Sequence, residues 1–149
     1  MYDMILCKPE EKYGFAELIL FSSIKDKIRV INEDKDLISN QNFNGIFLIE
    51  NFRISPEIIK LIGNKKKSIF LLDFSMIYNS YGVKRGILLS MIRRFLKYCI
   101  KYNANYAFAN FAKKNEGIRN PDEIIGICSL LGLNEIEAKN GLLKIKNYL

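Results

Sequence analysis

Six short apolar runs alternate with helix-like or polar stretches along the chain, and this alternation limits the possible folds more than any other feature. The runs cover residues 2–7, 18–21, 28–31, 45–49, 69–74 and 106–111. Each is rich in Ile, Leu, Phe or Val, which is typical of strands that are buried on both faces. Strands that alternate with helical segments form βα units, so the pattern predicts a mainly parallel sheet.

The helical stretches carry their own start and stop signals. Ser55 before Pro56 predicts a capped helix that ends near Gly63, and Asn120 before Pro121 predicts another that ends near Gly132. We expect a brief helix at 34–39, a loop or short turn at 9–14, and a last helix from about 135 to 149 with Asn134 as its cap. The longest helix, at about 83–102, has one continuous apolar stripe, formed by Leu88, Met91, Ile92, Phe95, Leu96 and Cys99.

A chain of 149 residues that is 49% hydrophobic is expected to form one domain, residues 1–149. Six strands are too few for a standard eight-unit barrel, which takes about 250 residues. The fold class we predict is α/β, as a reduced TIM-barrel-like domain with mainly parallel strands and outer helices. No apolar run reaches the roughly 20 residues that span a bilayer, and Asp3 interrupts the first one, so we expect a cytoplasmic protein.

The net charge of +7 is concentrated in one segment. Residues 74–115 contain eight of the 23 basic residues and none of the 16 acidic residues, so the rest of the chain is close to neutral. The eight are Lys84, Arg85, Arg93, Arg94, Lys97, Lys101, Lys113 and Lys114. A basic surface that binds a polyanion is the natural interpretation, and a solvated lysine-rich surface is the alternative.

The chain has no histidine, which removes the usual zinc, iron and manganese ligand sets and every Ser-His or Cys-His nucleophile. Cys7, Cys99 and Cys128 are widely spaced in apolar surroundings, so we expect reduced thiols in the core. Asp3, Glu50 and Asp73 stand at predicted strand ends and are candidates for magnesium. The simpler interpretation is structural: Asp3 ends a strand, Glu50 precedes a loop, and Asp73 binds backbone amides or a nearby cation.

From residue 43 onward, several motifs occur in a fixed order. Tyr81-Gly82-Val83-Lys84-Arg85-Gly86 leads into the basic helix, and Lys101-Tyr102-Asn103-Ala104 follows it. Ile118-Arg119-Asn120-Pro121-Asp122-Glu123 then starts a helix that ends at Leu131-Gly132-Leu133. Together these motifs resemble the protein component 3 family of archaeal ribonuclease P, whose eukaryotic relatives are the barrel-like ribonuclease P and MRP subunit.

The resemblance implies a TIM-barrel-like fold related to a phosphoesterase superfamily with a histidine-rich metal site, which a chain without histidine does not retain. It also implies a catalytic RNA that cleaves precursor tRNA with magnesium, and a ferredoxin-like protein partner, component 2. The chain would then be a non-catalytic subunit of an endoribonuclease that binds no cofactor or metal itself.

Within this interpretation, arginines and lysines neutralise RNA phosphates without reading sequence. The residues we expect to bind RNA are Lys84, Arg85, Arg93, Arg94, Lys97 and Arg119. Arg119 could instead form a salt bridge with Asp122 or Glu123. Two other functions remain open: a protein–protein scaffold subunit without direct RNA contact, and a divergent metal-dependent phosphoesterase.

Overall fold

A computed structural model gives the fold and describes residues 1–5, 9 and 11–149. The strands are β1 (Tyr2–Ile5), β2 (Glu17–Leu20), β3 (Ile28–Ile31), β4 (Gly45–Ile49), β5 (Ser68–Asp73) and β6 (Tyr106–Ala109). The α-helices are α1 (Asp34–Ser39), α2 (Pro56–Lys65), α3 (Ser75–Tyr78), α4 (Gly82–Lys101), α5 (Pro121–Leu130) and α6 (Glu135–Leu143). The described residues also form the 3₁₀ helices η1 (Phe21–Lys27), η2 (Asn115–Gly117) and η3 (Lys144–Tyr148).

All strand pairs are parallel, and they follow the order of an incomplete barrel. One sheet has the order β3-β4-β5-β6, and a second consists of β1 and β2. The sheets meet where the chain beyond β6 lies along β1: Phe111 donates a backbone hydrogen bond to Met4 (2.9 Å), and Ile5 forms a parallel bridge with Ala112. The strands therefore curve round in chain order, as in a TIM barrel, and η1 spans the open side between β2 and β3.

Alternate residues of the central strands face two different cores. Phe47, Phe70 and Phe108 pack outward against the helices, in a cluster that includes the buried stripe of α4. Their neighbours Ile46, Ile69 and Ala107 face the inside of the curved sheet. This period of two explains why nearly every residue of these strands is apolar, because neither face meets water.

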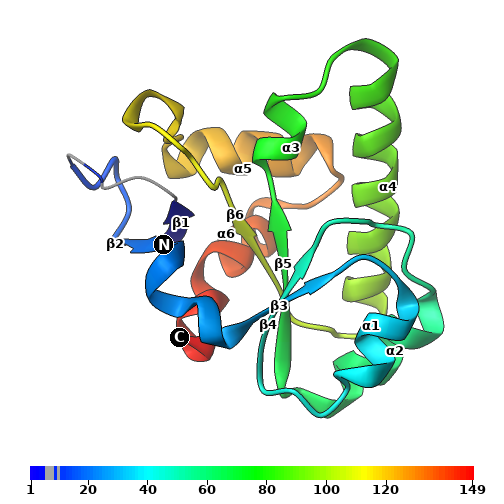
Figure 1. Ribbon diagram of the computed structural model, residues 1–149. Helices are drawn as coiled ribbons and strands as arrows, with labels where there is room; N and C mark the ends of the chain where they lie inside the picture. The colour runs from blue at the N-terminus through cyan, green and yellow to red at the C-terminus, as the bar shows by residue number, and fades with distance from the viewer. Residues whose placement is uncertain (6–8, 10) are drawn as a thin grey trace.

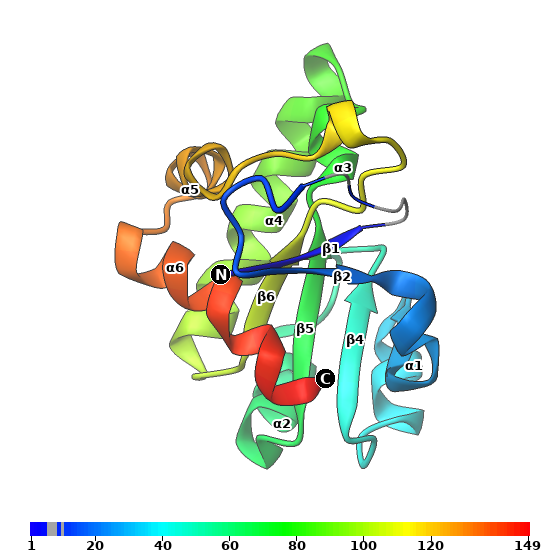
Figure 2. The same ribbon diagram turned by 90° about the vertical axis from the view of Figure 1, so that its left-hand side faces the viewer.

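The inside of the curved sheet is filled by segments from both ends of the chain. Met4 of β1 and Ile19 of β2 contribute to the inner core, and Ile145 of η3 joins them. Figure 2 shows β1 and β2 crossing in front of β5 and β6, with η3 below them. The helices α2 and α4 cover the outer face, and α5 and α6 complete the layer beside β6 (Figure 1).

The predicted reduced TIM-barrel-like α/β fold is confirmed, with six parallel strands at the expected places. Asn120 and Asn134 cap their helices as predicted, each accepting a bond from the backbone N–H of a Glu three residues later. Ser55 occupies the cap position of α2 but makes no side-chain capping bond; its backbone N–H donates to the Asp34 carboxylate (2.9 Å).

One other local prediction needs correction. The last helix is α-helical only to Leu143 and continues as η3, which turns Ile145 into the inner core. The short helices η1 and α3 were not predicted. The expected turn at 9–14 and the end of the first run, at 6–7, lie partly outside the described residues.

Cys99 and Cys128 are free, buried thiols, as predicted. Burial raises the pKa of Cys128 to about 12 and raises that of Cys99 further, so both remain protonated at neutral pH. The prediction for Cys7 falls outside the described residues. No helix among those described is long and apolar enough to span a membrane.

The packing of α6 on β6 can be tested at Gly141. A Cβ added there would overlap the ring of Phe108, whereas one added at Gly126 of α5 would meet nothing. We expect Gly141→Ala to lower the free energy of unfolding by roughly 1–3 kcal/mol through overpacking. Gly126→Ala, as the matched control, should raise it by up to about 1 kcal/mol, because alanine favours the helix. Urea denaturation of both variants measures the difference, and a Gly141→Ala protein as stable as the parent would contradict this packing.

Candidate nucleic-acid interface

The basic segment lies largely on the outer side of α4, facing away from the sheet. Ile92, Phe95 and Leu96 are buried against the sheet, whereas Arg93, Arg94, Lys97 and Lys101 are exposed. The first turns of α4 extend beyond the sheet, so the helix stands free there (Figure 1). The predicted separation of apolar stripe and basic face is therefore present.

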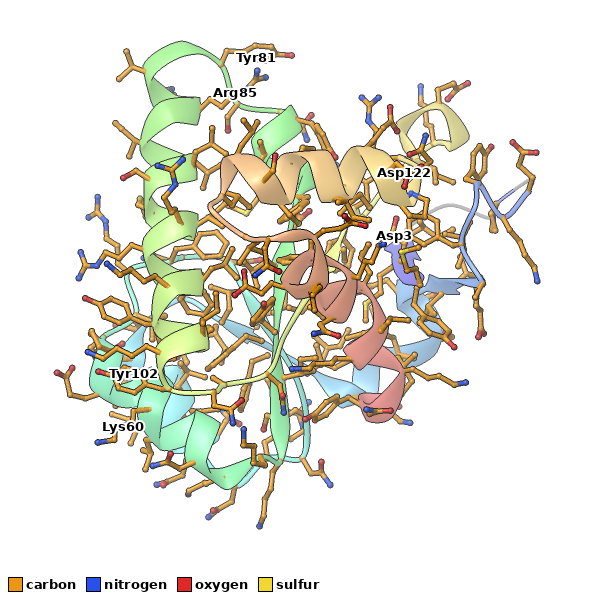
Figure 3. The ribbon with its side chains drawn as sticks, turned by 180° about the vertical axis from the view of Figure 1, so that it is seen from behind. Asp3, Lys60, Tyr81, Arg85, Tyr102 and Asp122 are labelled. Carbon is orange, nitrogen blue, oxygen red and sulfur yellow. The ribbon has the colours of Figure 1, made fainter. Side chains whose placement is uncertain are left out.

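Lys84 and Arg85 lie on this free end and differ in their surroundings. Lys84 is exposed. The Nε of Arg85 donates to the carbonyl oxygen of Ser80 (2.6 Å), and its guanidinium lies 5.3 Å from the ring centre of Tyr81 (Figure 3). Arg85 thus holds the turn between α3 and α4, a role that the sequence did not reveal.

Arg93 also has an acceptor within the protein. Its guanidinium donates to the carbonyl oxygen of Leu130, at the carboxyl end of α5. Carbonyls at a helix end lack partners within the helix, and a cation there also suits the helix dipole. Arg93 therefore joins α4 to α5, and part of its hydrogen-bonding capacity is already used.

Arg94, Lys97 and Lys101 form the most open part of the basic face, and two tyrosines lie among them. The rings of Tyr98 and Tyr102 are nearly parallel, with centres 6.3 Å apart and 10° between their planes. Arg94 lies over the first ring, at 5.9 Å, and Lys101 over the second, at 5.3 Å. Lys60 of α2 approaches Tyr102 from the other helix, at the opposite end of α4 from Tyr81 (Figure 3). Cations and half-exposed aromatic rings on one surface suit phosphates and bases together.

A second feature is a cleft at the carboxyl ends of β5 and β6, which we call the strand-end cleft. It has a volume of about 620 Å³ and is lined by α3, the segment that follows β6, η2 and the residue before Asn120. Figure 1 shows these segments gathered above the same end of the sheet. Its lining residues are Ser75, Tyr78, Asn79, Asn110, Phe111, Ala112, Lys113, Lys114, Glu116, Gly117 and Arg119. In parallel α/β folds this edge of the sheet is where ligands bind.

Arg119 is the one predicted RNA-binding residue that lines this cleft. Its guanidinium is 5.0 Å from the ring centre of Tyr78 and 3.8 Å from the carboxylate of Glu123. The alternative of a salt bridge with Glu123 is therefore present, although 3.8 Å is a loose contact. The Nε of Arg119 and the hydroxyl of Tyr78 are buried without a hydrogen-bond partner in the described part of the chain.

Phe111 turns the chain at the edge of the cleft. It has a φ of 44°, a left-handed conformation that costs a bulky residue free energy. Its neighbour Asn110 is buried, with its side-chain amide donating to the carbonyl oxygen of Gly117 (2.6 Å). Together these features fix the loop that carries Lys113 and Lys114.

The three acidic magnesium candidates do not share one environment. Asp73 accepts a bond from the backbone N–H of Ser75 (2.7 Å), one of the structural roles expected for it, and burial raises its pKa. Glu50 is exposed. Asp3 lies within β1 rather than at a strand end, is 1% exposed, and accepts a bond from the backbone N–H of Asn110 (2.7 Å).

The other carboxylate oxygen of Asp3, Oδ2, has no partner among the described residues. Burial raises the pKa of Asp3 to about 7, and the nearby charge of Asp73 acts in the same direction. In the described part of the chain, no three His, Cys, Asp or Glu side chains are grouped as metal ligands would be.

The strand-end cleft could not be predicted from the sequence, because the residues that line it come from separate segments of the chain. Lys113 and Lys114 were counted in the basic segment but not selected as binding residues. Nothing in the sequence marks Tyr78 as a binding residue, because a single Tyr after a strand is typical of a core position.

Comparison with solved structures finds the same fold in a chain of the "cryo-EM structure of archaeal Ribonuclease P with mature tRNA". The TM-score is 0.69, the sequence identity is 14%, and the match covers 99% of this chain and 78% of that chain. At this identity the likeness establishes the fold. No protein-family model matches the sequence, and no curated protein matches it.

The raised pKa of Asp3 makes stability depend on pH. An unfolded Asp titrates near 3.8, so between about pH 4 and 7 the folded chain holds a proton that the unfolded chain has lost. Stability should therefore fall as pH rises through this window, by roughly 4 kcal/mol from this group. We expect Asp3→Asn to reduce that fall, and so to be more stabilising at pH 8 than at pH 4.

Chemical denaturation at both pH values measures this effect, with the exposed Asp26→Asn as control. If Asp3→Asn changes the free energy of unfolding, relative to the parent, by the same amount at pH 4 and at pH 8, then the Asp3 carboxyl titrates normally. Because the pKa of Asp73 is also raised, some pH dependence should remain in the variant.

Proposed function

We propose that this chain is an RNA-binding protein subunit of ribonuclease P and supports the 5′ maturation of precursor tRNA. The observation that carries the proposal is the fold shared over 99% of the chain with a chain of a ribonuclease P structure that contains tRNA. The motifs that resemble the component 3 family were found independently of that comparison. The family's protein component 3 is accordingly the subunit that we propose.

Charge supports RNA as the ligand. The basic segment contains no acidic residue, so the outer face of α4 presents positive charge without internal neutralisation. Lysines and arginines that approach RNA phosphates release condensed counterions, and this release drives binding with little dependence on sequence. A folded RNA domain brings its own phosphates close together, and a rigid cationic helix lowers the repulsion between them.

The predicted contacts are not equivalent in this proposal. Arg94 and Lys97, together with Lys101, have exposed side chains and make the main RNA surface. Lys84 lies on the free end of α4, where it can reach RNA without opening any contact. Arg85 and Arg93 already donate to backbone carbonyls, so replacing either one would change the protein as well as its binding.

Catalysis is assigned to the RNA in this proposal, with magnesium bound there and no cofactor held by the protein. The chain offers no histidine as a general base or metal ligand. Its buried thiols have raised pKa values and so are poor nucleophiles.

The free end of α4 suits a protein partner. Tyr81 and Val83 are 75% and 79% exposed, and Ile87 is also exposed one turn further along. Exposed apolar side chains grouped in this way commonly mark protein–protein contacts. We assign this surface to the ferredoxin-like component 2 that the family resemblance implies.

The RNA surface is tested with the triple variant Arg94→Ala, Lys97→Ala and Lys101→Ala. These side chains are exposed, so the variant should keep the melting temperature of the parent. The slope of log affinity against log salt should shrink by about 0.7–0.9 for each lost phosphate contact. Precursor-tRNA cleavage by a reconstituted holoenzyme should then need a higher concentration of this subunit.

The matched control is Lys12→Ala, Lys25→Ala and Lys27→Ala, which removes the same charge from exposed positions outside the basic segment. A folded triple variant with an unchanged salt slope would remove this face from the RNA interface. If the parent chain gives no stimulation of cleavage and no crosslink to the RNA, the subunit role itself fails. Stimulation without a crosslink from α4 would favour a scaffold that touches only protein.

The protein interface is tested by size-exclusion chromatography of this chain mixed with component 2 in the absence of RNA. We expect one co-eluting species at micromolar concentration, and we expect Val83→Asp to separate the two because a buried charge has no partner there. Ile136→Asp, at another exposed apolar position, serves as the control. Co-elution that survives Val83→Asp would place the interface elsewhere.

A further inference from the structure

The strand-end cleft contains polar groups that the protein itself leaves without partners. The hydroxyl of Tyr78 and the Nε of Arg119 are both buried, and neither has a hydrogen-bond acceptor among the residues that the structure describes. Most buried polar groups in proteins form hydrogen bonds, because burying a donor removes its bonds to water and an unpaired donor gains nothing to offset that free-energy cost. Both residues line the cleft, so a small shift of either side chain brings its unpaired donor to an acceptor supplied from outside.

The charges around the cleft favour an anion. Lys113 and Lys114 are exposed at its rim, and neither forms a salt bridge with any described residue. Arg119 adds a third cation, which the loose contact with Glu123 only partly neutralises. Glu116 is the one acidic residue in the lining. A group with several acceptor oxygens can use an Arg, a Tyr hydroxyl and two Lys at once, and phosphate has this chemistry.

The protonation state of Tyr78 agrees with a donor role. Burial raises its pKa to about 12, and the neighbouring Arg119 cation opposes this only in part. The hydroxyl is therefore protonated at neutral pH. Because it has no acceptor among the described residues, Tyr78→Phe removes no hydrogen bond that the structure shows.

The size and position of the cleft fit a nucleotide. A volume of about 620 Å³ lies within the range of small-molecule sites. The cleft is open at the carboxyl ends of parallel strands, and it is held by the fixed turn at Phe111 rather than by a free loop. This site is separate from the outer face of α4 on which the main RNA surface lies.

We propose that the strand-end cleft binds one phosphate group of an RNA strand, held by Lys113, Lys114, Arg119 and the Tyr78 hydroxyl. The choice of RNA as the source of that phosphate rests on the proposed function. A free mononucleotide carries the same chemical group and is the other possible source. The chemistry of the cleft requires only the phosphate.

The first arm of the test uses small probes: inorganic phosphate, uridine 5′-monophosphate, and uridine as the matched compound without phosphate. Calorimetric titration of the folded full chain should show binding of the monophosphate and none of uridine. The double variant Lys113→Ala and Lys114→Ala should weaken this binding by about tenfold or more, and Tyr78→Phe should weaken it severalfold. Lys25→Ala with Lys27→Ala, which removes the same charge next to the amino end of β3, should bind like the parent.

The second arm uses a single-stranded RNA and measures fluorescence anisotropy. If the phosphate comes from RNA, the cleft variants should weaken RNA binding and the monophosphate should compete with RNA for the parent protein. Monophosphate binding that is lost in the cleft variants while RNA binding and competition are unaffected would overturn the RNA source and identify a free nucleotide site.

The outcomes separate this inference from the proposed function. If no probe binds and both cleft variants bind RNA as the parent does, the cleft inference is wrong while RNA binding by α4 stands. If the parent binds no RNA at all, the proposed function fails, and the small-probe arm alone decides whether the cleft takes phosphate. Melting curves without ligand identify any variant that is unfolded, and Tyr78→Phe should melt no lower than the parent.

Discussion

The contact between β1 and the segment after β6 is the interaction on which the rest of the structure depends. It consists of the Asn110 N–H donating to Asp3, the Phe111 N–H donating to Met4, and the bridge between Ile5 and Ala112. Without it, the four-stranded sheet would expose the apolar inner face that Met4 and Ile19 cover. The same contact fixes the segment that forms one wall of the strand-end cleft. Barrel closure and cleft geometry therefore have a common origin in a few hydrogen bonds between these two segments.

Much of the fold could be predicted from local patterns because the strands are buried on both faces. Continuous apolar runs marked all six strands, and the Asn-Pro and Asn-Glu signals placed the starts of α5 and α6 correctly. The failures have a physical reason as well. At Ser55 the bond that forms is a long-range one: its backbone N–H donates to the carboxylate of Asp34, 21 positions away, and its side chain makes no capping bond. The change from α6 to η3 follows from the inner core that Ile145 fills, which no local signal reports.

The candidate site was predictable only where it lies on one element. The basic face of α4 follows from helical spacing alone, because the stripe at Ile92, Phe95 and Leu96 fixes the direction of the remaining side chains. The strand-end cleft depends instead on tertiary contacts among α3, the loop after β6 and the residue before α5. Arg119 was selected from the sequence, but its buried Nε and its contact with Tyr78 arise only when α3 packs beside it. The hydrogen bonds from the Arg85 and Arg93 side chains to backbone carbonyl oxygens could likewise not be predicted from the sequence.

The bond between Asp3 and Asn110 joins residues that are 107 positions apart. β1 pairs with β2, which follows it closely in the chain, but a ribosome releases both strands long before the segment after β6 exists. Until then, their apolar side chains have only local neighbours, and ordering the intervening chain imposes a large entropic cost on late closure. The apolar side chains of β1 and β2 therefore wait for most of the chain before the barrel closes over them. The central strands β4 and β5, which are close in the chain, are suited to form the first stable nucleus.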